Sequence, residues 1–317
     1  MWKSVKQTRI ILKCIADECR GRFHGGAFIV LVVAAIAVLS GCAQAPEKAE
    51  AGPGATRPAP KLGLALGGGG ARGFAHVGVI QVLEEAGLRP DLVVGTSAGS
   101  LVASLYASGK SPRQLQALAE SMDESHFADW TLPLFNRGVL RGEALARYVQ
   151  QQVGGALIEG MAMPLGIVAT DLNSGEAIVF RRGDTGTAVR ASSAVPGLFQ
   201  PVRIAGRDYV DGGLVSPVPV LHAREMGADV VVAVDISSAP EGNPASDTLQ
   251  ILLQTFAIMG RSINALELRH AQVVVRPALT GSGSADFGNR RRAIEAGRQA
   301  MLAALPTLRA QLRMAGR

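Results

Sequence analysis

The chain has 317 residues, enough for one large domain or two small ones, with 38 glycines, 48% hydrophobic residues and 4% aromatic residues. This composition predicts an aliphatic core with many tight turns and favours an α/β protein over an all-β sandwich. The formal net charge is +6, but residues 1–41 contribute +4 of it, with six Lys or Arg against Asp17 and Glu18. The +2 that remains excludes a basic nucleic-acid footprint, so no nucleic-acid partner is expected.

Residues 1–41 are predicted to form an export signal. A basic stretch precedes an uncharged apolar run at 27–39, which is short for a membrane span. The run ends in Leu39-Ser40-Gly41-Cys42, which resembles the lipobox of bacterial lipoproteins and predicts cleavage after Gly41 and lipid on Cys42. A short membrane anchor or a buried helix is the alternative. Ala43 follows the cysteine where an inner-membrane lipoprotein has Asp, which implies an outer-membrane lipoprotein facing the periplasm.

Residues 42–61 are expected to form a disordered tether behind the lipidated cysteine. The segment carries no large apolar side chain and therefore cannot contribute to a core. A coil of this length has a mean reach of roughly 25 Å, enough to hold a domain near lipid headgroups. The folded domain is then expected over 62–317.

A glycine-rich loop follows the first predicted strand, at 61–66, and precedes a helix predicted over 74–86. Two interpretations compete for it. The spacing Gly68-x-Gly70-x-x-Gly73 fits the dinucleotide-binding template, while the same backbone N–H groups suit an oxyanion hole with Arg72 tying the loop down. A dinucleotide fold needs an acid at the end of the second strand, but Asp91 lies before that strand. The oxyanion hole is therefore favoured.

The second predicted strand follows Asp91 and ends in Gly95-Thr96-Ser97-Ala98-Gly99, and a helix is predicted over 100–108. This is the strand–turn–helix context of a G-x-S-x-G nucleophile elbow, in which glycines let strand and helix close around a strained serine. A glycine-rich turn with a chance serine is the alternative. The elbow predicts Ser97 as an exposed nucleophile beside the N–H groups of a helix start.

The rest of the chain alternates between predicted helices and strands. Asp171 falls in a predicted hairpin turn, between strands at 165–170 and 177–182. Helices are expected at 112–122, 141–153, 187–194, 218–226, 247–268 and 290–305, and strands at 202–204, 208–210, 230–234 and 272–276. No His or Cys spacing typical of a metal site is present.

Asp211-Gly212-Gly213 ends one of these strands just before a predicted helix. A simple hairpin turn is one explanation. The alternative is an acid at the edge of an α/β sheet where sites form, with two glycines that allow another group to approach closely.

Three motifs now stand in one order, namely the glycine loop, the elbow and the Asp-Gly-Gly turn. Together they resemble the patatin-like phospholipases, in particular the bacterial relatives of neuropathy target esterase, over about residues 62–300. The segments 168–172 and 191–196 are also similar to that family. The resemblance implies a three-layer α/β/α sandwich with a mostly parallel central sheet, a lipid or ester substrate and no cofactor. It implies that Ser97 is the nucleophile and Asp211 its partner, with an oxyanion hole formed by Gly68, Gly69, Gly70, Ala71, Arg72, Gly73 and Ala98.

Two functions of other classes stay open, a dinucleotide-dependent enzyme built on the glycine loop and a non-catalytic envelope lipoprotein. The group that takes the proton from Ser97 is either Asp211 itself or a histidine, because a triad hydrolase places a histidine between acid and nucleophile. Asp211 is expected to contact the Ser97 hydroxyl directly. Of His76, His126, His222 and His270, only His222 follows Asp211 closely enough in the chain to approach the site.

Overall fold

The computed structural model describes residues 59–122, 129, 138–238, 247–281, 283 and 286–316. The predicted signal peptide, Cys42, most of the predicted tether and His126 lie outside these residues. The strands are β1 (Leu62–Leu66), β2 (Leu92–Thr96), β3 (Gly138–Leu140), β4 (Leu165–Asp171), β5 (Ala177–Phe180), β6 (Gly197–Phe199), β7 (Val202–Ile204), β8 (Arg207–Asp211), β9 (Val230–Val234) and β10 (Val273–Val275).

The helices alternate with these strands. The α-helices are α3 (Phe74–Glu85), α4 (Ala98–Ala107), α5 (Pro112–Ser121), α6 (Glu143–Gln152), α7 (Thr185–Ser192), α8 (Val220–Glu225), α9 (Thr248–Glu267) and α10 (Arg290–Ala315). Short 3-10 turns are η1 (Gly70–Gly73), η3 (Ile158–Gly160), η4 (Gly212–Leu214), η5 (Leu268–His270) and η6 (Phe287–Asn289).

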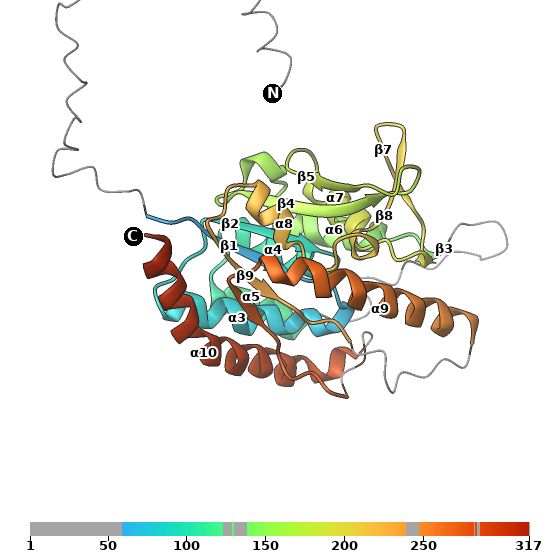
Figure 1. Cartoon of the computed structure of the whole chain (residues 1–317). Coiled ribbons are helices and arrows are strands. Elements are labelled where there is room, and N and C mark those ends of the chain that lie inside the picture. The colour runs from blue at the N-terminus through green and yellow to red at the C-terminus, as the bar shows by residue number, and fades with distance from the viewer. Residues whose placement is uncertain are drawn as a thin grey trace, which may run out of the picture. The chain divides into compact units, whose positions relative to one another are not determined.

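The central sheet has eight strands in the order β10-β9-β1-β2-β4-β8-β7, with β5 also paired to β4 (Figure 1). The five strands from β10 to β4 run parallel, and β5, β7 and β8 join in antiparallel pairs. Every residue of β1, β2 and β9 is buried. Such strands need cover on both faces, which explains their nearly continuous apolar sequences.

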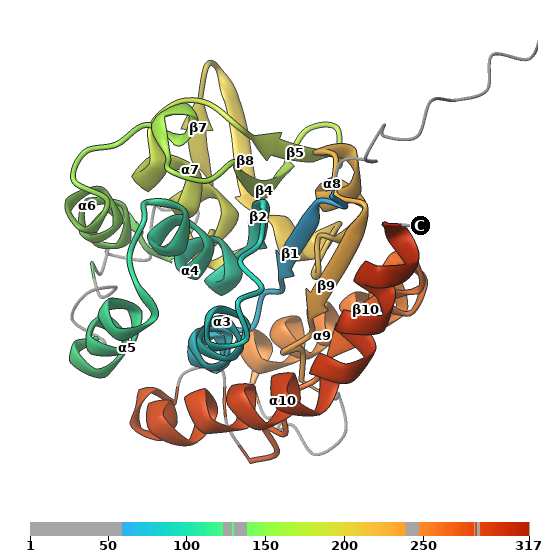
Figure 2. The same cartoon turned by 90° about the vertical axis from the view of Figure 1, so that its left-hand side faces the viewer.

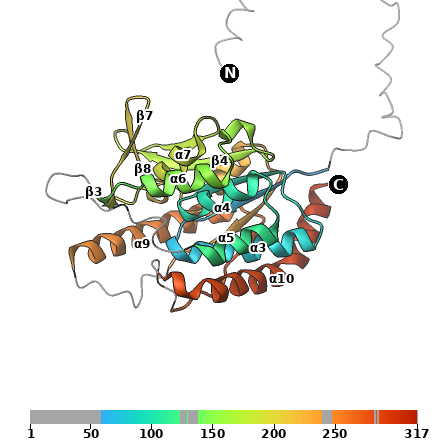
Figure 3. The same cartoon turned by 180° about the vertical axis from the view of Figure 1, so that it is seen from behind.

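Helices cover both faces of the sheet, so the predicted three-layer α/β/α arrangement is confirmed. Alternation along β1 sends Leu64 and Leu66 into a core shared with α3, α4 and α10, and Ala65 into a second core shared with α8. Figure 2 shows α3 and α10 on one side of the sheet and α8 on the other. From behind, α3, α5 and α10 lie together (Figure 3).

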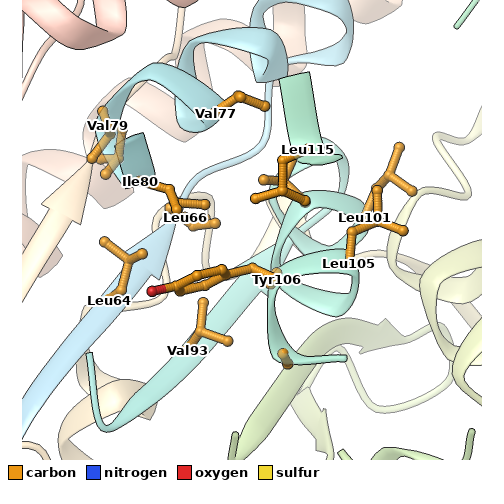
Figure 4. Packing of buried hydrophobic residues seen from close by; sticks show 14 of the residues in the cluster. Leu64, Leu66, Val77, Val79, Ile80, Val93, Leu101, Leu105, Tyr106 and Leu115 are labelled. Carbon is orange, nitrogen blue, oxygen red and sulfur yellow. The ribbon is translucent and has the colours of Figure 1, made fainter. Parts of the chain in front are cut away.

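The larger core is built around Tyr106 of α4, which lies among Leu64, Ile80 and Val93 (Figure 4). The Tyr106 hydroxyl donates a hydrogen bond of 2.6 Å to Glu84 of α3. Burial and this carboxylate raise the pKa of the phenol. The contact ties the helix that begins at Ser97 to the helix that follows the glycine loop.

Most predicted elements appear within one to three residues of their expected bounds, but two predictions are wrong. Only helices were expected between 111 and 160, yet β3 lies there and pairs in parallel with β6. A three-residue strand has too few positions for a period-two pattern, and its pairing partner is distant in sequence.

The last helix was expected to end at 305, yet α10 continues through Pro306 to Ala315. Burial of Leu308 beyond the proline offsets the hydrogen bond that proline cannot make.

Within the described ranges, no helix combines the length and the apolar composition needed to cross a bilayer.

Candidate active site

Ser97 lies at the sharp turn between β2 and α4, with its backbone at φ 54° and ψ −124°. A positive φ is strained for a residue with a side chain and is typical of a nucleophile elbow. The flanking glycines explain how the turn closes. A Cβ at Gly95 would overlap the carbonyl of Gly99, and a Cβ at Gly99 would overlap the carbonyl of Leu66. The elbow predicted from the sequence is therefore present, with Ser97 partly exposed.

The sheet brings Asp211 to Ser97 through strand register. Residues 167–170 of β4 pair with β5 along one edge, so β2 and β8 must share the other edge. There β2 ends with Thr96 opposite Val168, and the antiparallel β8 ends with Asp211 opposite Ala169. The two strands meet end to end, which brings the Ser97 hydroxyl close enough to the Asp211 carboxylate to influence its pKa. Two strands of opposite direction, rather than neighbouring parallel strands, thus bring the predicted pair together.

The Asp211 carboxyl is buried, and burial raises its pKa to about 6. Burial disfavours the charged form, whereas nearby donors favour it. The Gly213 N–H donates to Oδ1 at 2.7 Å, and the neighbouring Ser97 hydroxyl also lowers the pKa. A carboxylate with a pKa near neutrality is suited to accept and return a proton.

The glycine loop packs directly on the elbow. A Cβ at Gly68 would lie 3.1 Å from Cβ of Ser97, and one at Gly73 would lie 2.9 Å from Cβ of Ala98. The N–H of Gly68 donates to the Pro217 carbonyl at 3.0 Å, so Gly68 shapes the loop and has no N–H free for an anion. Within the described part of the chain, the N–H groups of Gly69, Gly70 and Ala98 have no acceptor.

Two buried side chains hold this loop in place. Nε of Arg72 donates to the Gly69 carbonyl at 3.2 Å, and burial lowers the pKa of its guanidinium. Nε2 of His76 lies 2.8 Å from the Gly67 carbonyl. Burial lowers the His76 pKa to about 4, so the ring is neutral near pH 7 and donates this hydrogen bond. Ala71 is also buried, in the 3-10 turn η1. Arg72, Ala71 and His76 therefore support the loop and do not face Ser97.

None of the three described histidines contacts the Ser97–Asp211 pair. Nδ1 of His222 lies 2.9 Å from the Glu225 carboxylate on its own helix, and His270 is exposed. The structure brings Asp211 and Ser97 together at the strand ends, and the contact of the His222 ring is with Glu225 rather than with this pair. Asp171, predicted as a turn residue, accepts the N–H groups of Asn173 and Ser174 in the β4–β5 hairpin.

A family model described as patatin-like phospholipase matches residues 64–224, which include the glycine loop, Ser97 and Asp211. The chain belongs to this family. The fold and the order of the three motifs agree with that assignment.

Proteins with similar sequences are found in bacteria and in mammals. An uncharacterized NTE family protein of Mycobacterium tuberculosis is 37% identical over 201 residues, covering 59% of this chain and 52% of that protein. A second one from the same species is 33% identical over 274 residues, covering 77% and 46%. The mouse patatin-like phospholipase domain-containing protein 6 is 35% identical over 57% of this patatin-like chain and 14% of its own length. The chain thus spans about half the length of its mycobacterial relatives.

Solved structures with a similar fold include VipD from Legionella pneumophila and ExoU from Pseudomonas aeruginosa. VipD has a TM-score of 0.49 at 16% identity and covers 80% of this chain and 68% of its own. ExoU in complex with SpcU has a TM-score of 0.49 at 17% identity, covering 81% and 53%.

Three residues that hold the pair in this patatin-like site were not predicted to have a role. Ser192 accepts the Ser97 N–H at 2.9 Å and donates to the Val168 carbonyl at 2.5 Å. The Asp211 N–H donates to the Ala194 carbonyl at 3.0 Å, and Thr170 Oγ1 donates to the Asp211 carbonyl at 2.8 Å. These residues fall in the family-like segments 168–172 and 191–196, and that similarity was the available signal.

Proposed function

We propose that this chain is a serine acyl hydrolase that cleaves lipid carboxylic esters of the phospholipase A, lysophospholipase or esterase type. The observation that carries the proposal is the meeting of Ser97, at a strained elbow, with the buried Asp211 carboxyl where β2 and β8 end opposite neighbouring residues of β4. Membership of the patatin-like phospholipase family supports a lipid ester as the substrate class.

In the proposed acylation step, Ser97 Oγ attacks the ester carbonyl carbon while its proton passes to Asp211. The negative charge then develops on the former carbonyl oxygen. The N–H groups of Gly69, Gly70 and Ala98 are the proposed donors to that oxygen, with Arg72 and the remaining loop residues fixing their direction. Asp211 returns its proton to the departing alcohol as the ester C–O bond breaks, leaving an acyl group on Ser97.

Deacylation repeats the sequence with water. Asp211 takes a proton from a water molecule while the water oxygen attacks the acyl carbon. The bond between the acyl carbon and Ser97 Oγ then breaks. The proton then returns to Ser97 Oγ, and a free carboxylic acid leaves. Because the Asp211 pKa is raised to about 6, this carboxyl is ionised at neutral pH and returns a proton more readily than an ordinary aspartic acid.

Single substitutions test the assignment of the pair. Ser97→Ala removes one oxygen and is expected to lower ester hydrolysis about 10³-fold or more with the fold retained. Asp211→Asn is expected to be nearly as inactive, whereas His222→Gln and His270→Gln retain substantial activity. Steady-state hydrolysis of a soluble short-chain ester, with a fluorophosphonate probe to label Ser97, measures both effects.

Wild-type activity in the Ser97→Ala variant would disprove the nucleophile assignment. An inactive His222→Gln variant beside an active Asp211→Asn variant would instead indicate a triad enzyme. Wild-type protein that neither hydrolyses esters nor reacts with the probe would favour a non-catalytic lipoprotein, and detectable NAD binding would favour the dinucleotide alternative.

We propose that lipidated Cys42 anchors the enzyme in the outer membrane, with the domain facing the periplasm. The motif Leu39-Ser40-Gly41-Cys42 at the end of the apolar run supports this. Cys42→Ala is expected to abolish incorporation of radiolabelled palmitate and to release the protein from the membrane fraction. A Cys14→Ala variant is the matched control, since that cysteine lies upstream of the predicted cleavage site. Label retained in Cys42→Ala would refute the anchor.

A further inference from the structure

Ser216 lies at the centre of a set of hydrogen bonds just behind the Ser97–Asp211 pair. Its N–H donates to the carbonyl of Gly212, the residue after Asp211, at 2.9 Å. Its carbonyl accepts the hydroxyl of Thr96, the residue before Ser97, at 2.9 Å. Both bonds are backbone contacts that Ser216 makes to immediate neighbours of the reacting residues. Ser216 therefore links the turn that carries the acid to the strand end that carries the nucleophile.

The next residue extends this link to the glycine loop. The carbonyl of Pro217 accepts the Gly68 N–H at 3.0 Å. A displacement of residues 216–217 would therefore reach three parts of the site at once, namely the acid turn, the elbow and the loop that supplies the proposed oxyanion donors.

The Ser216 hydroxyl is itself held by Glu267, the last residue of α9. It lies 2.8 Å from Oε1 and 3.1 Å from Oε2 of the Glu267 carboxylate. The carboxylate also accepts the Leu221 N–H at 3.4 Å. Both Ser216 and Glu267 are buried, and burial raises the pKa of Glu267. A buried carboxylate carries a desolvation cost and is rarely placed where only packing is needed.

The helix α9 buries two polar side chains and exposes several large apolar ones, which argues against a purely packing role for Glu267. Its buried positions include Asn264 and Glu267, both polar. Four large apolar side chains of the same helix are 48–63% exposed, namely Ile251, Ile258, Met259 and Leu266. A helix held only by apolar burial has the opposite arrangement. The inward polar residues are therefore best explained by what they contact.

We propose that Glu267 is a positioning residue that acts through Ser216 to hold Asp211 and Ser97 in their reactive arrangement. The inference rests on the proposed hydrolase function. Glu267 touches neither substrate nor reacting atoms. Its effect passes through one hydroxyl group to the backbone on both sides of the pair. Small misplacements of a catalytic pair lower turnover strongly, by up to about 10²-fold for 1 Å.

Four variants separate positioning from stability. Glu267→Met keeps the side-chain volume and removes the acceptor, Ser216→Ala removes the donor, the double variant removes both, and Glu267→Gln keeps an acceptor oxygen. We expect Glu267→Met and Ser216→Ala each to lower kcat and the fluorophosphonate labelling rate of Ser97 about tenfold to hundredfold. KM for a soluble short-chain ester, the final labelling stoichiometry and Tm should stay near wild type. The double variant should be no slower than either single one, and Glu267→Gln should retain most of the rate.

Ser262→Ala on the exposed face of α9 is the matched control and should behave as wild type. Full kcat in both Glu267→Met and Ser216→Ala would overturn the inference. So would losses that follow Tm and labelling stoichiometry, because those indicate a smaller folded fraction. If Glu267→Met does not fold, Ser216→Ala alone decides the question. Wild-type protein without hydrolysis or Ser97 labelling would refute the proposed function itself, and an active wild type with normal variants would refute only the positioning role.

Discussion

The Ser97 backbone is held in a conformation that costs an L-residue about 1–3 kcal/mol, and nearby hydrogen bonds offset that cost. Its N–H donates to Ser192. Its carbonyl accepts the Ser100 N–H at 2.8 Å and the Ser100 hydroxyl at 2.6 Å. The hydroxyl is therefore presented from a backbone fixed on both sides. Such preorganisation leaves little rearrangement to the reaction itself.

The Asp211 pKa predicts how activity depends on pH. In the proposed mechanism only the ionised carboxylate of Asp211 accepts the Ser97 proton, and burial raises the pKa of this carboxyl to about 6. The kcat/KM for a neutral ester should therefore rise through an acid limb with an apparent pKa near 6 in the free enzyme. A pH–rate profile from pH 4 to 8 measures it. A limb near 4, the ordinary value for an aspartate, would contradict this environment for Asp211.

The raised pKa of Asp211 also makes the free energy of unfolding depend on pH. Stability falls as the pH rises, whereas activity is expected to increase. The pKa of about 6 in the folded protein lies above the ordinary value of 3.8 for an aspartic acid, so folding favours the protonated carboxyl. That stabilisation is fully present below pH 3.8 and is lost as the pH rises through 6. Asp211→Asn keeps an oxygen for the Gly213 N–H and removes the charge. It should be more stable than wild type at pH 8, by an amount that shrinks toward pH 4, in denaturation by urea. An equal difference at both pH values would exclude this cause.

At the scale of elements, the contact between α3 and α10 fixes the helix that continues from the glycine loop. Gly297 of α10 faces α3 so closely that a Cβ there would overlap the Ala75 carbonyl, and one at Gly78 would overlap the Ile294 carbonyl. The two glycines let the helix backbones approach without intervening side chains. The start of α3, and with it the loop, therefore depends on the C-terminal helix.

Gly297→Ala should separate these two helices. Overpacking in a dense interior costs about 1–3 kcal/mol, and overlap with backbone atoms of Ala75 rather than with a flexible side chain places this case at the upper end. The denaturation midpoint should fall, and ester hydrolysis per folded molecule should fall with it as the loop shifts. Gly160→Ala is the control, because a Cβ there meets no atom within 4 Å. Equal midpoints for the two variants would contradict the close packing.

Elements with a strong local pattern were predictable from the sequence. The strand expected over 230–234 is β9 with the same bounds, and the helix expected at 112–122 is α5, which begins at Pro112 after the Ser111 cap. The elbow was recognisable because its glycines and serine lie within five residues. Features that depend on distant pairing were not. Ser192 meets Ser97 across 95 positions, and Ser216 meets Thr96 across 120. Neither serine has a local pattern that distinguishes it from any other small polar residue.

At the scale of the whole molecule, the parallel pairing of β1 with β9 joins distant parts of the chain. Lys61 at the start of β1 bonds to Asp229, 168 residues later. Parallel strands connected over such distances close slowly, because the entropy of a long loop is lost before any contact forms. Helices such as α3 and α10 can form locally, and much earlier.

Refolding should therefore restore helical signal before activity. After dilution from urea, far-ultraviolet circular dichroism should recover in an early phase, and ester hydrolysis and Ser97 labelling should return together in a later one. Ser97→Ala, followed by circular dichroism alone, controls for any effect of the probe. Activity that returns with the helical signal would show that strand pairing does not limit assembly of the site.

The central position of β1 also creates a risk of aggregation while folding is incomplete. Until β9 arrives, one edge of a strand whose five residues are all apolar or glycine, and all buried in the final fold, stays open to pairing with other chains. Intermolecular pairing rises with concentration, whereas closure onto β9 does not. The yield of active enzyme on refolding should accordingly be set by protein concentration rather than by the stability of the finished fold.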